Sequence, residues 1–393
     1  MHSTNFKHLN YSLIHFKPLW QHRAFYDTEV PWKNTYPALF EALLALDAGH
    51  AEQLAKDNMA LTQWFEPHLP ELCAQLSAIK INKSPPTNPL LSSRYSQAIP
   101  GRKWQQISAF SHAIPTLNHP IVEWCSGKAH LGRTLARHHQ QTVYSLELDA
   151  MLCEAGQSLA DHQGVAVELI KHDVLKPLPT QAQGIERAHI GLHACGELHI
   201  TLLKTASQLR CPQIAISPCC YHKTPHNNYS PLSLQAKRAG LTLSKADMHL
   251  AQEETVTAGE RVQKLRRKEQ LWRLAFDLLQ RQQLGSNSYQ AIPSTPKKIF
   301  SEDFSNFCYW AAQTFGLKLN NNIDYERYLA LGENRRQFVL KMDLVRQLFR
   351  RPLELWLALD RVLYLEEQGY QVNLSEFCER KTTPRNLLIY AQR

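Results

Sequence analysis

Short apolar runs alternate with helical stretches through the middle of this chain, and this alternation constrains its fold most strongly. Between residues 120 and 217 the runs PIVEW, TVYSLEL, VAVELIKHD, AHIGLHA and QIAISP are separated by stretches with three- and four-residue apolar spacing. Strands separated by helices in this way form βαβ units around a mainly parallel sheet. The pattern therefore predicts an α/β fold with a doubly wound sheet.

The remaining residues suggest three further segments around this core, which we place at 101–250. Residues 1–100 have helical spacing and end in a proline-rich run, INKSPPTNPLLSSRYSQAIPGRK, which predicts an irregular connection. Residues 251–351 are rich in Arg, Gln and Leu and predict a basic helical insertion. Residues 352–393 predict a last helix and a hairpin that complete the core. At 393 residues the chain has room for two or three domains of roughly 150 residues each.

Composition narrows the setting in which the chain works. It carries 44 Lys and Arg against 35 Asp and Glu, a formal charge of +9, and this excess favours polyanionic partners such as RNA. The nine cysteines are scattered, without the density of a disulfide scaffold, and no run approaches the ~20 apolar residues of a membrane span. We therefore expect a cytoplasmic protein with free thiols and no membrane association.

The longest helix candidate is the run ERVQKLRRKEQLWRLAFDLLQRQQLG. One face would carry five apolar side chains, and the rest would be basic. The apolar set is Val262, Leu265, Trp272, Phe276 and Leu279, and the basic set is Arg261, Lys264, Arg267 and Lys268. Both a solvated basic face and a stripe that contacts nucleic acid remain open.

The loop EWCSGKAHLGR follows the first predicted strand, where an open parallel sheet binds its ligand. A pyrophosphate loop needs three closely spaced glycines, but His130 stands where the third would be. The alternative frame is acidic-x-small-x-Gly-x-small, formed by Glu123, Cys125, Gly127 and Ala129. A nucleoside with an amino-acid tail needs fewer glycines, and its ammonium group can meet the Glu123 carboxylate.

Two further acidic residues follow the next predicted strands. Glu147 ends TVYSLEL and can accept hydrogen bonds from a ribose diol. Asp173 in IKHDVL can accept from an adenine amino group, with Val174 packed on the ring. Each acidic residue alone is equally consistent with a helix cap. Together with the small-residue loop, they predict S-adenosylmethionine as the cofactor.

Four motifs, EWCSGKAHLGR, GLHACGEL, SPCCYHKT and TPRNLLIYA, resemble a methyltransferase family. This family groups eukaryotic tRNA 2′-O-methyltransferases of the acceptor stem with methyltransferase-like proteins of other substrates. The resemblance covers about 100–260 and the last 40 residues. It implies a Rossmann-like, seven-stranded methyltransferase sheet closed by an antiparallel hairpin at 371–391. The cofactor positions that it carries over are Glu123, Cys125, Gly127, Lys128, Glu147 and Asp173, with His193, Ala194 and Cys195 beside the methyl group.

Motifs that the sequence lacks help to predict which atom accepts the methyl group. Amino-group methylation commonly uses Asn or Asp followed by Pro-Pro-aromatic after the fourth strand, where this chain reads HACGEL. Cys195 and Cys219 would suit pyrimidine C5 methylation, but the expected Asp-x-Pro is absent. A ribose hydroxyl needs only positioning and a base, for which the candidates are His193, His222 and Lys103. We therefore predict a methyltransferase that acts on tRNA or rRNA, with a ribose 2′-hydroxyl as the favoured acceptor.

Other interpretations of the same residues stay open. The acceptor could instead be a protein or a small molecule, or the chain could be a catalytically silent module that binds S-adenosylmethionine. Cys195, Cys219, Cys220 and His222 could hold zinc, but adjacent cysteines seldom both reach one ion, so we predict no metal. We expect buried thiols to line the substrate pocket instead. The predicted substrate contacts are Cys219, Cys220, Tyr221 and His130.

Overall fold

The computed structural model describes residues 1–84, 96, 99–253, 259–285, 288–320 and 322–393. Contacts divide the chain into two units that are described separately below. Unit 1 comprises Met1–His15, Ala74–Thr257 and Arg350–Arg393, and unit 2 comprises Phe16–Cys73 and Ala258–Phe349. Most of the proline-rich connection expected before residue 103 lies outside the described residues. The four segment limits inferred from the sequence stay predictions.

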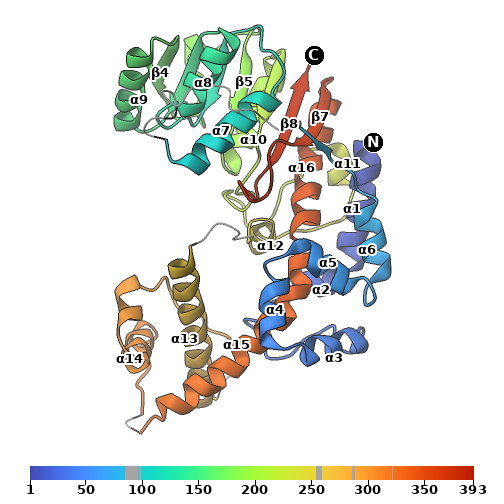
Figure 1. Cartoon of the computed structure of the whole chain (residues 1–393), viewed down its shortest axis with the longest axis vertical. Coiled ribbons are helices and arrows are strands. Elements are labelled where there is room, and N and C mark those ends of the chain that lie inside the picture. Colours follow the sequence, from blue (N-terminus) through green and yellow to red (C-terminus); the bar gives the residue numbers. More distant parts are fainter. Residues whose placement is uncertain (85–95, 97–98, 254–258, 286–287, 321) are drawn as a thin grey trace. The chain divides into compact units, whose positions relative to one another are not determined.

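A mixed sheet forms the centre of unit 1 (Figure 1). Among the described residues it has eight strands in the order β1-β7-β8-β6-β5-β2-β3-β4. The five strands from β4 to β6 are parallel, whereas β8 is antiparallel to both β6 and β7. The strands are β1 (Asn82–Lys83), β2 (Ile121–Trp124), β3 (Val143–Glu147), β4 (Val167–Lys171), β5 (Ala188–Gly191), β6 (Gln213–Ile216), β7 (Gln371–Glu376) and β8 (Leu387–Gln392).

The predicted α/β class and the closing hairpin are confirmed, with one difference in the strand count. The sequence predicts seven strands, and the eighth is the short β1, whose Asn82 and Lys83 pair in parallel with Ser375 and Glu376 of β7. Two polar residues have no apolar alternation that could reveal a strand. Only the edge of β7 recruits them into the sheet.

Helices cover both faces of this sheet. An apolar core joins α7, α8 and α9 to one face, through residues such as Phe110, Leu135 and Ala160. On the other face α10 lies so close that a Cβ on Gly191 would be 3.0 Å from Leu202. The helices of unit 1 are α1 (His2–His15), α7 (Gly101–Ala113), α8 (His130–His139), α9 (Ala150–Gln163), η2 (Thr180–Ala182), α10 (Glu197–Gln208), α11 (Leu234–Lys237), α12 (Lys245–Leu250) and α16 (Arg350–Glu367).

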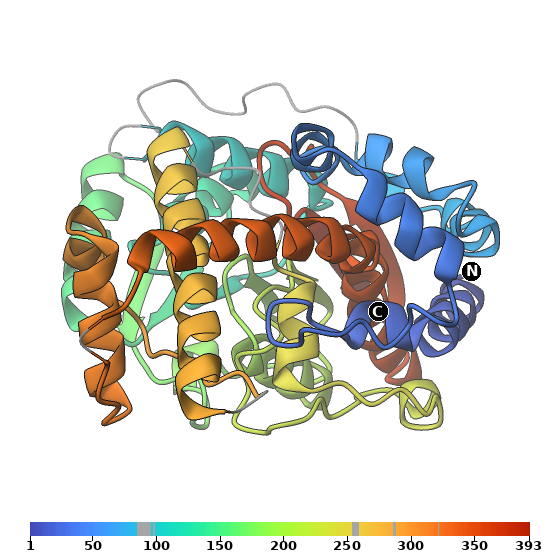
Figure 2. The same cartoon turned by 90° about the horizontal axis from the view of Figure 1, so that it is seen from below.

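Unit 2 is helical in its described residues. Its two longest helices cross, as Figure 2 shows, and Gly332 lies where a Cβ would be 2.6 Å from the Cβ of Ala275. The helices are α2 (Lys17–Gln21), α3 (Pro37–Ala45), α4 (Ala48–Leu54), α5 (Asn58–Phe65), α13 (Glu260–Leu284), η3 (Lys297–Ser301), α14 (Phe304–Thr314) and α15 (Tyr325–Leu348). Helix α6 (Pro70–Ser77) spans the limit between the units.

The predicted long helix is confirmed as α13, but its two faces differ from the expectation. Trp272, Phe276 and Leu279 are buried, whereas Val262 is 45% exposed. Of the basic set, Lys268 donates to the carbonyl oxygen of Phe300 at 2.7 Å and is therefore not a solvated cation. The apolar face therefore begins one turn later than the spacing suggested, with the half-buried Leu265.

A membrane span would need a long helix with little charge. Within the described ranges, no helix is both long enough and apolar enough to cross a bilayer.

Candidate active site

The turn that follows β2 is built from left-handed residues at alternate positions. Cys125, Gly127 and Ala129 have φ values of 57°, 58° and 48°. These are the three small residues of the sequence frame. The left-handed backbone has no steric cost at Gly127, whereas the Cβ atoms of Cys125 and Ala129 make it cost roughly 1 to 2 kcal/mol each. A Cβ on Gly127 would meet nothing within 4 Å, so the backbone there faces open space. The turn thus offers a close approach to a ligand.

Glu123 lies at the end of β2 and is turned toward the protein interior. Its side chain is 3% exposed, and Oε2 accepts a hydrogen bond from Ser145 Oγ at 2.8 Å. A Cβ on Gly132 would be 2.4 Å from Oε2, so this glycine makes room for the carboxylate. Burial raises the pKa of Glu123 to about 7, against the lowering effect of hydrogen bonds from Ser145 and Gly132. The predicted contact with an ammonium group stays a prediction.

Glu147 ends β3 and ties three backbone groups together. Oε2 accepts from the Gly127 N–H at 2.8 Å, and Oε1 accepts from Leu148 at 2.8 Å and Asp149 at 3.0 Å. A carboxylate has about four acceptor positions, so one remains, on Oε2. The group is thus held beside the turn after β2 with capacity for one further donor.

Asp173 and Val174 follow β4 at the same edge of the sheet. The Asp173 carboxylate accepts from the Leu175 N–H at 3.1 Å, and Val174 is buried. The side chain of Lys128, in the turn after β2, is exposed. The structure therefore places the predicted cofactor residues of three successive strand ends at one edge, because β2, β3 and β4 are parallel and in register.

The loop after β5 carries His193, Ala194 and Cys195. His193 is exposed, Ala194 is buried, and Cys195 is half-buried. Gly196 has a φ of 59°, and a Cβ there would be 2.0 Å from the carbonyl oxygen of Lys223. This glycine lets the β5 loop lie directly against the loop after β6.

A buried network that the sequence did not predict supports this loop. His199 Nδ1 lies 3.1 Å from the Ala194 carbonyl oxygen, and Arg361 Nε donates to His199 Nε2 at 2.8 Å. With Nε2 as an acceptor, Nδ1 must carry the proton, so His199 is the neutral tautomer that donates to Ala194. Burial and Arg361 lower the pKa of His199 well below its usual value, in agreement with this tautomer.

The charge of Arg361 is balanced on α16 itself and on the loop before α11. Arg361 is fully buried and donates to Tyr229 Oη at 2.9 Å, and Tyr229 in turn donates to Asp360. Asp360 also accepts from the N–H and Oγ of Ser233 at 2.8 and 2.6 Å. The one sequence signal for this network is the pair Asp360 and Arg361 inside the apolar helix LELWLALDRVLYL.

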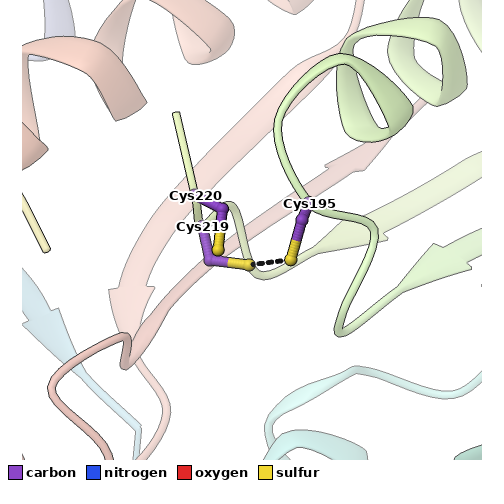
Figure 3. A group of neighbouring side chains, drawn as sticks. All are labelled: Cys195, Cys219 and Cys220. Atoms are coloured by element: carbon purple, nitrogen blue, oxygen red, sulfur yellow. Dashed lines mark hydrogen bonds between the residues drawn. The ribbon is translucent and has the colours of Figure 1, made fainter. Parts of the chain in front are cut away.

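Three thiols meet where the loops after β5 and β6 touch (Figure 3). The Sγ atoms of Cys195, Cys219 and Cys220 all lie within 4.8 Å of one another, and the Cys195 to Cys219 distance is 3.1 Å. Hydrogen bonds with Cys195 and Cys219 lower the pKa of Cys220, whereas hydrogen bonds with Cys195 and Cys220 raise the pKa of Cys219. A fourth cysteine, Cys125, lies in the turn after β2, where burial and, second, the charge of Glu147 raise its pKa to about 12.

The predicted substrate residues that follow these cysteines differ in exposure. Tyr221 is buried, and its ring centre lies 4.7 Å from the guanidinium carbon of Arg361. His222 is half-buried and its ring lies 4.8 Å from that of His249. Burial and then His249 lower the pKa of His222, so its imidazole is neutral at neutral pH. Only His222 of the two is placed to exchange a proton with a bound molecule.

Lys103 and His130 approach the site from α7 and α8. Lys103 is exposed near the start of α7, and its charge acts on Glu123, His130 and His193. His130 is buried, with Nδ1 at 2.5 Å from Arg133. Burial, followed by Arg133, lowers the pKa of His130 to about 4. The charge of Lys103 therefore acts on the predicted base His193. His130, in contrast, is buried beside Arg133 and not exposed to a substrate.

Two cavities in unit 1 can be compared with this site. One of about 50 Å³ is lined by residues that include Glu197, Tyr221 and Tyr229, and so lies under the loop after β6. The other, about 760 Å³, is a groove lined by residues of α1 and α11. None of the predicted site residues lines the larger groove. We therefore do not assign the active site to this groove, although it is the larger of the two.

A family model described as a methyltransferase domain matches residues 102–226. The chain carries a methyltransferase domain. The match covers the segment from α7 to the loop after β6, and so includes every strand end described above. The match confirms the predicted enzyme class, methyltransferase, for residues 102–226, and S-adenosylmethionine as the predicted cofactor agrees with that class.

Solved structures of methyltransferases are similar to about a third of the chain. A SAM-dependent methyltransferase from Aquifex aeolicus is 14% identical, over 33% of this chain and 72% of that one, with a TM-score of 0.26. TrmK from M. capricolum, in complex with S-adenosyl-homocysteine, is 14% identical over 32% and 51%, with a TM-score of 0.24. A geranyl diphosphate methyltransferase with GPP and sinefungin is 14% identical over 29% and 44%, with a TM-score of 0.26. The chain spans only 39% to 44% of the length of several matched structures.

The residues at the carboxyl edge of the sheet fit S-adenosylmethionine. Open space above Gly127 allows a ligand to reach the backbone, and the remaining acceptor position of Glu147 suits a ribose hydroxyl. Asp173 keeps an oxygen for which no hydrogen bond is described. Glu123 fits less simply, because its buried carboxylate is already bonded to Ser145.

Proposed function

We propose that this methyltransferase acts on RNA, either tRNA or rRNA, with a ribose 2′-hydroxyl as the acceptor. The resemblance of HACG and CCYH to the family that includes tRNA 2′-O-methyltransferases supports this acceptor. The formal charge of +9 supports a polyanionic partner. A cytoplasmic location, where such RNA is available, is part of the same proposal.

The observation that carries the RNA proposal is a group of exposed cations distributed around the first two turns of α13. Arg261, Lys264 and Arg266 are all exposed, within the first two turns of a helix whose later turns are packed. Phosphate groups are bound chiefly by Lys and Arg, with counterion release as the driving force. Arg267 differs, because it pairs with Glu52 at 2.9 Å.

In this proposal the cofactor lies across the strand ends of β2, β3 and β4. When bound, S-adenosylmethionine supplies an electrophilic methyl group. The Gly127 backbone approaches its amino-acid tail, Glu147 accepts from one ribose hydroxyl through Oε2, and Asp173 accepts from the adenine amino group. Val174 packs against the adenine ring, and Ala194 and Cys195 lie beside the methyl group.

The acceptor hydroxyl needs a group to receive its proton. His222 is a candidate base because burial lowers its pKa, so that its ring is neutral and able to accept at neutral pH. His193, with Lys103 near it, is the alternative at the loop after β5. Apart from this proton, catalysis of methyl transfer requires mainly alignment and the exclusion of water.

Transfer of tritiated methyl groups from S-adenosylmethionine tests the proposal directly. Total RNA and total protein from a strain that lacks this protein serve as separate acceptors. We expect label in RNA, sensitive to ribonuclease and resistant to protease, and lower incorporation with His222→Ala at unchanged cofactor affinity. The exposed His226→Ala serves as the matched control.

Two other results would identify the rival functions. Label that survives ribonuclease but not protease would assign the acceptor to protein and overturn the RNA proposal. Cofactor binding without label in RNA, protein or small-molecule extracts would identify a silent binding module.

A further inference from the structure

We propose that Cys195, Cys219 and Cys220 form a zinc site with three thiolate ligands and an open fourth position. The sequence argued against a metal because adjacent cysteines seldom reach one ion. The structure brings all three sulfur atoms within 4.8 Å of one another, across two loops, and this convergence reopens the question. Among the described residues it is a group that could hold an ion without any large movement.

The sulfur distances agree with a tetrahedral zinc site. Zinc to sulfur bonds of about 2.3 Å place two ligand sulfurs about 3.8 Å apart. The Cys195 and Cys219 sulfur atoms are 3.1 Å apart, which is shorter than this spacing. The upper limit on all three sulfur to sulfur distances, 4.8 Å, is longer than it. Shifts of under about 1 Å therefore convert the triangle into ligand geometry, which is within reach of side-chain rotation.

The backbone explains how neighbouring cysteines point to one place. In an extended chain, successive side chains point to opposite sides. Cys220 instead has a φ of 48°, a left-handed conformation that costs a residue with a Cβ roughly 1 to 2 kcal/mol. Such a conformation persists only where the surroundings enforce it, and it often serves a site.

Several hydrogen bonds hold this conformation. The Gly196 N–H donates to the Cys219 carbonyl oxygen at 3.1 Å, and the Lys223 N–H donates to that of Cys220 at 2.8 Å. With its amide oxygen turned toward the loop, Gln252 accepts from the N–H groups of Cys220 and Tyr221 at 2.6 and 2.7 Å. Metal sites characteristically have their ligands oriented by such outer contacts.

The exposure of the three cysteines indicates that the site is open on one side, and their thiolate chemistry indicates which ion it binds. Cys219 is buried, while Cys195 and Cys220 are half-buried, so the cluster has one accessible side through which an ion can enter. Thiolates are soft ligands that select zinc over magnesium or calcium. Structural zinc sites are closed by four protein ligands, whereas three ligands leave a position for water or a substrate atom.

Metal content tests this proposal without any measurement of methyl transfer. The full chain is reduced, loaded with zinc, desalted, and analysed by mass spectrometry of the metal. We expect one zinc ion per chain for the wild type and for Cys378→Ser, a half-buried cysteine outside the cluster. Cys195→Ser, Cys219→Ser and Cys220→Ser should each lower zinc affinity by at least the roughly 10- to 100-fold that the loss of an outer contact costs.

Cobalt replacement and thermal unfolding distinguish lost ligands from lost folding. Cobalt in the wild type should show thiolate charge-transfer bands and the strong visible bands of a tetrahedral ion, and these bands should weaken in Cys220→Ser. Circular dichroism should show that at least one of the three variants keeps its helix content.

Three results would overturn the site. The first is a wild-type chain that holds no more zinc than a variant in which Cys195, Cys219 and Cys220 are all replaced by Ser. The second is equal zinc in all the cysteine variants. The third is a disulfide between Cys195 and Cys219 found in zinc-loaded protein. None depends on the RNA proposal, so failure of one leaves the other standing.

Discussion

The Gly127 N–H donates to Glu147 Oε2 at 2.8 Å, so the turn after β2 is tied to the end of β3. The two residues belong to different motifs in the sequence, 20 positions apart. Their bond fixes the backbone turn and the carboxylate relative to each other before any ligand arrives. A preformed arrangement of this kind lowers the ordering cost of binding.

Two glycines in the same motif should respond differently to alanine. At Gly132 a Cβ would be 2.4 Å from Glu123 Oε2 and 2.7 Å from Ser145 Oγ, so Gly132→Ala should destabilise the fold by about 1 to 3 kcal/mol. At Gly127 a Cβ meets open space, so Gly127→Ala should cost about 1 to 2 kcal/mol from its φ and chiefly weaken cofactor binding. Calorimetric unfolding and titration with S-adenosylmethionine separate the two effects. Equal cofactor affinity for Gly127→Ala and the wild type would argue against our placement of the ligand.

Glu123 should make stability depend on pH in an unusual direction. Burial raises its pKa from 4.5 to about 7, so the folded state binds a proton that the unfolded state has released between these values. The contribution of this group to the free energy of unfolding is therefore largest below pH 4.5 and declines by a few kcal/mol as pH rises to about 7. Glu123→Gln should gain stability relative to the wild type between pH 5 and about pH 8. A constant difference in melting temperature across that range would contradict the buried carboxyl.

His199 should have the opposite effect. Burial and Arg361 lower its pKa well below 6.5, so the unfolded state takes up a proton that the folded state excludes. Its contribution is present above pH 6.5 and is lost as the pH falls below that value. His199→Gln should lower stability at pH 7 and flatten the acid limb of the profile, whereas the exposed His226→Gln should change neither. An unchanged acid limb in His199→Gln would remove the argument for a neutral, buried imidazole.

Charge reversal on α13 tests the RNA-binding surface. Arg261→Glu, Lys264→Glu and Arg266→Glu together should weaken RNA binding and reduce its salt dependence by about 0.7 per lost phosphate contact. Cofactor affinity, which belongs to unit 1, should not change. Filter binding at several salt concentrations measures the slope. Equal weakening by a control triple of exposed lysines in the same unit would show a general charge effect; this control is Lys297→Glu, Lys298→Glu and Lys318→Glu.

The sequence predicted those features that depend on local pattern. Alternating strands and helices, the hairpin and α13 all follow from apolar spacing over a few residues, and the structure has them at the expected places. Cys125, Gly127 and Ala129 were identified as a turn because small residues after a strand let a ligand approach the backbone closely, and the structure gives all three a left-handed backbone. These signals lie within about a dozen residues of one another.

Features that depend on distant partners were not predicted. Arg361 and His199 are 162 positions apart, and no local pattern links them. Glu123 is acidic at the right position, but its direction depends on the space left by Gly132 and on a hydroxyl from β3. The convergence of Cys219 and Cys220 rests on one left-handed residue that no propensity would assign to cysteine.

Mass spectrometry of nucleosides from cellular RNA is the most direct measurement of the central claim. Digested tRNA and rRNA are compared between the parent strain, a strain without this protein, and the latter supplied with the wild type or with Glu147→Ala. Loss of the ribose acceptor should weaken cofactor binding by about 1 to 3 kcal/mol. We expect one 2′-O-methylated nucleoside to disappear on deletion, to return with the wild type, and to stay low with Glu147→Ala. An identical set of methylated nucleosides in all four strains would contradict the account.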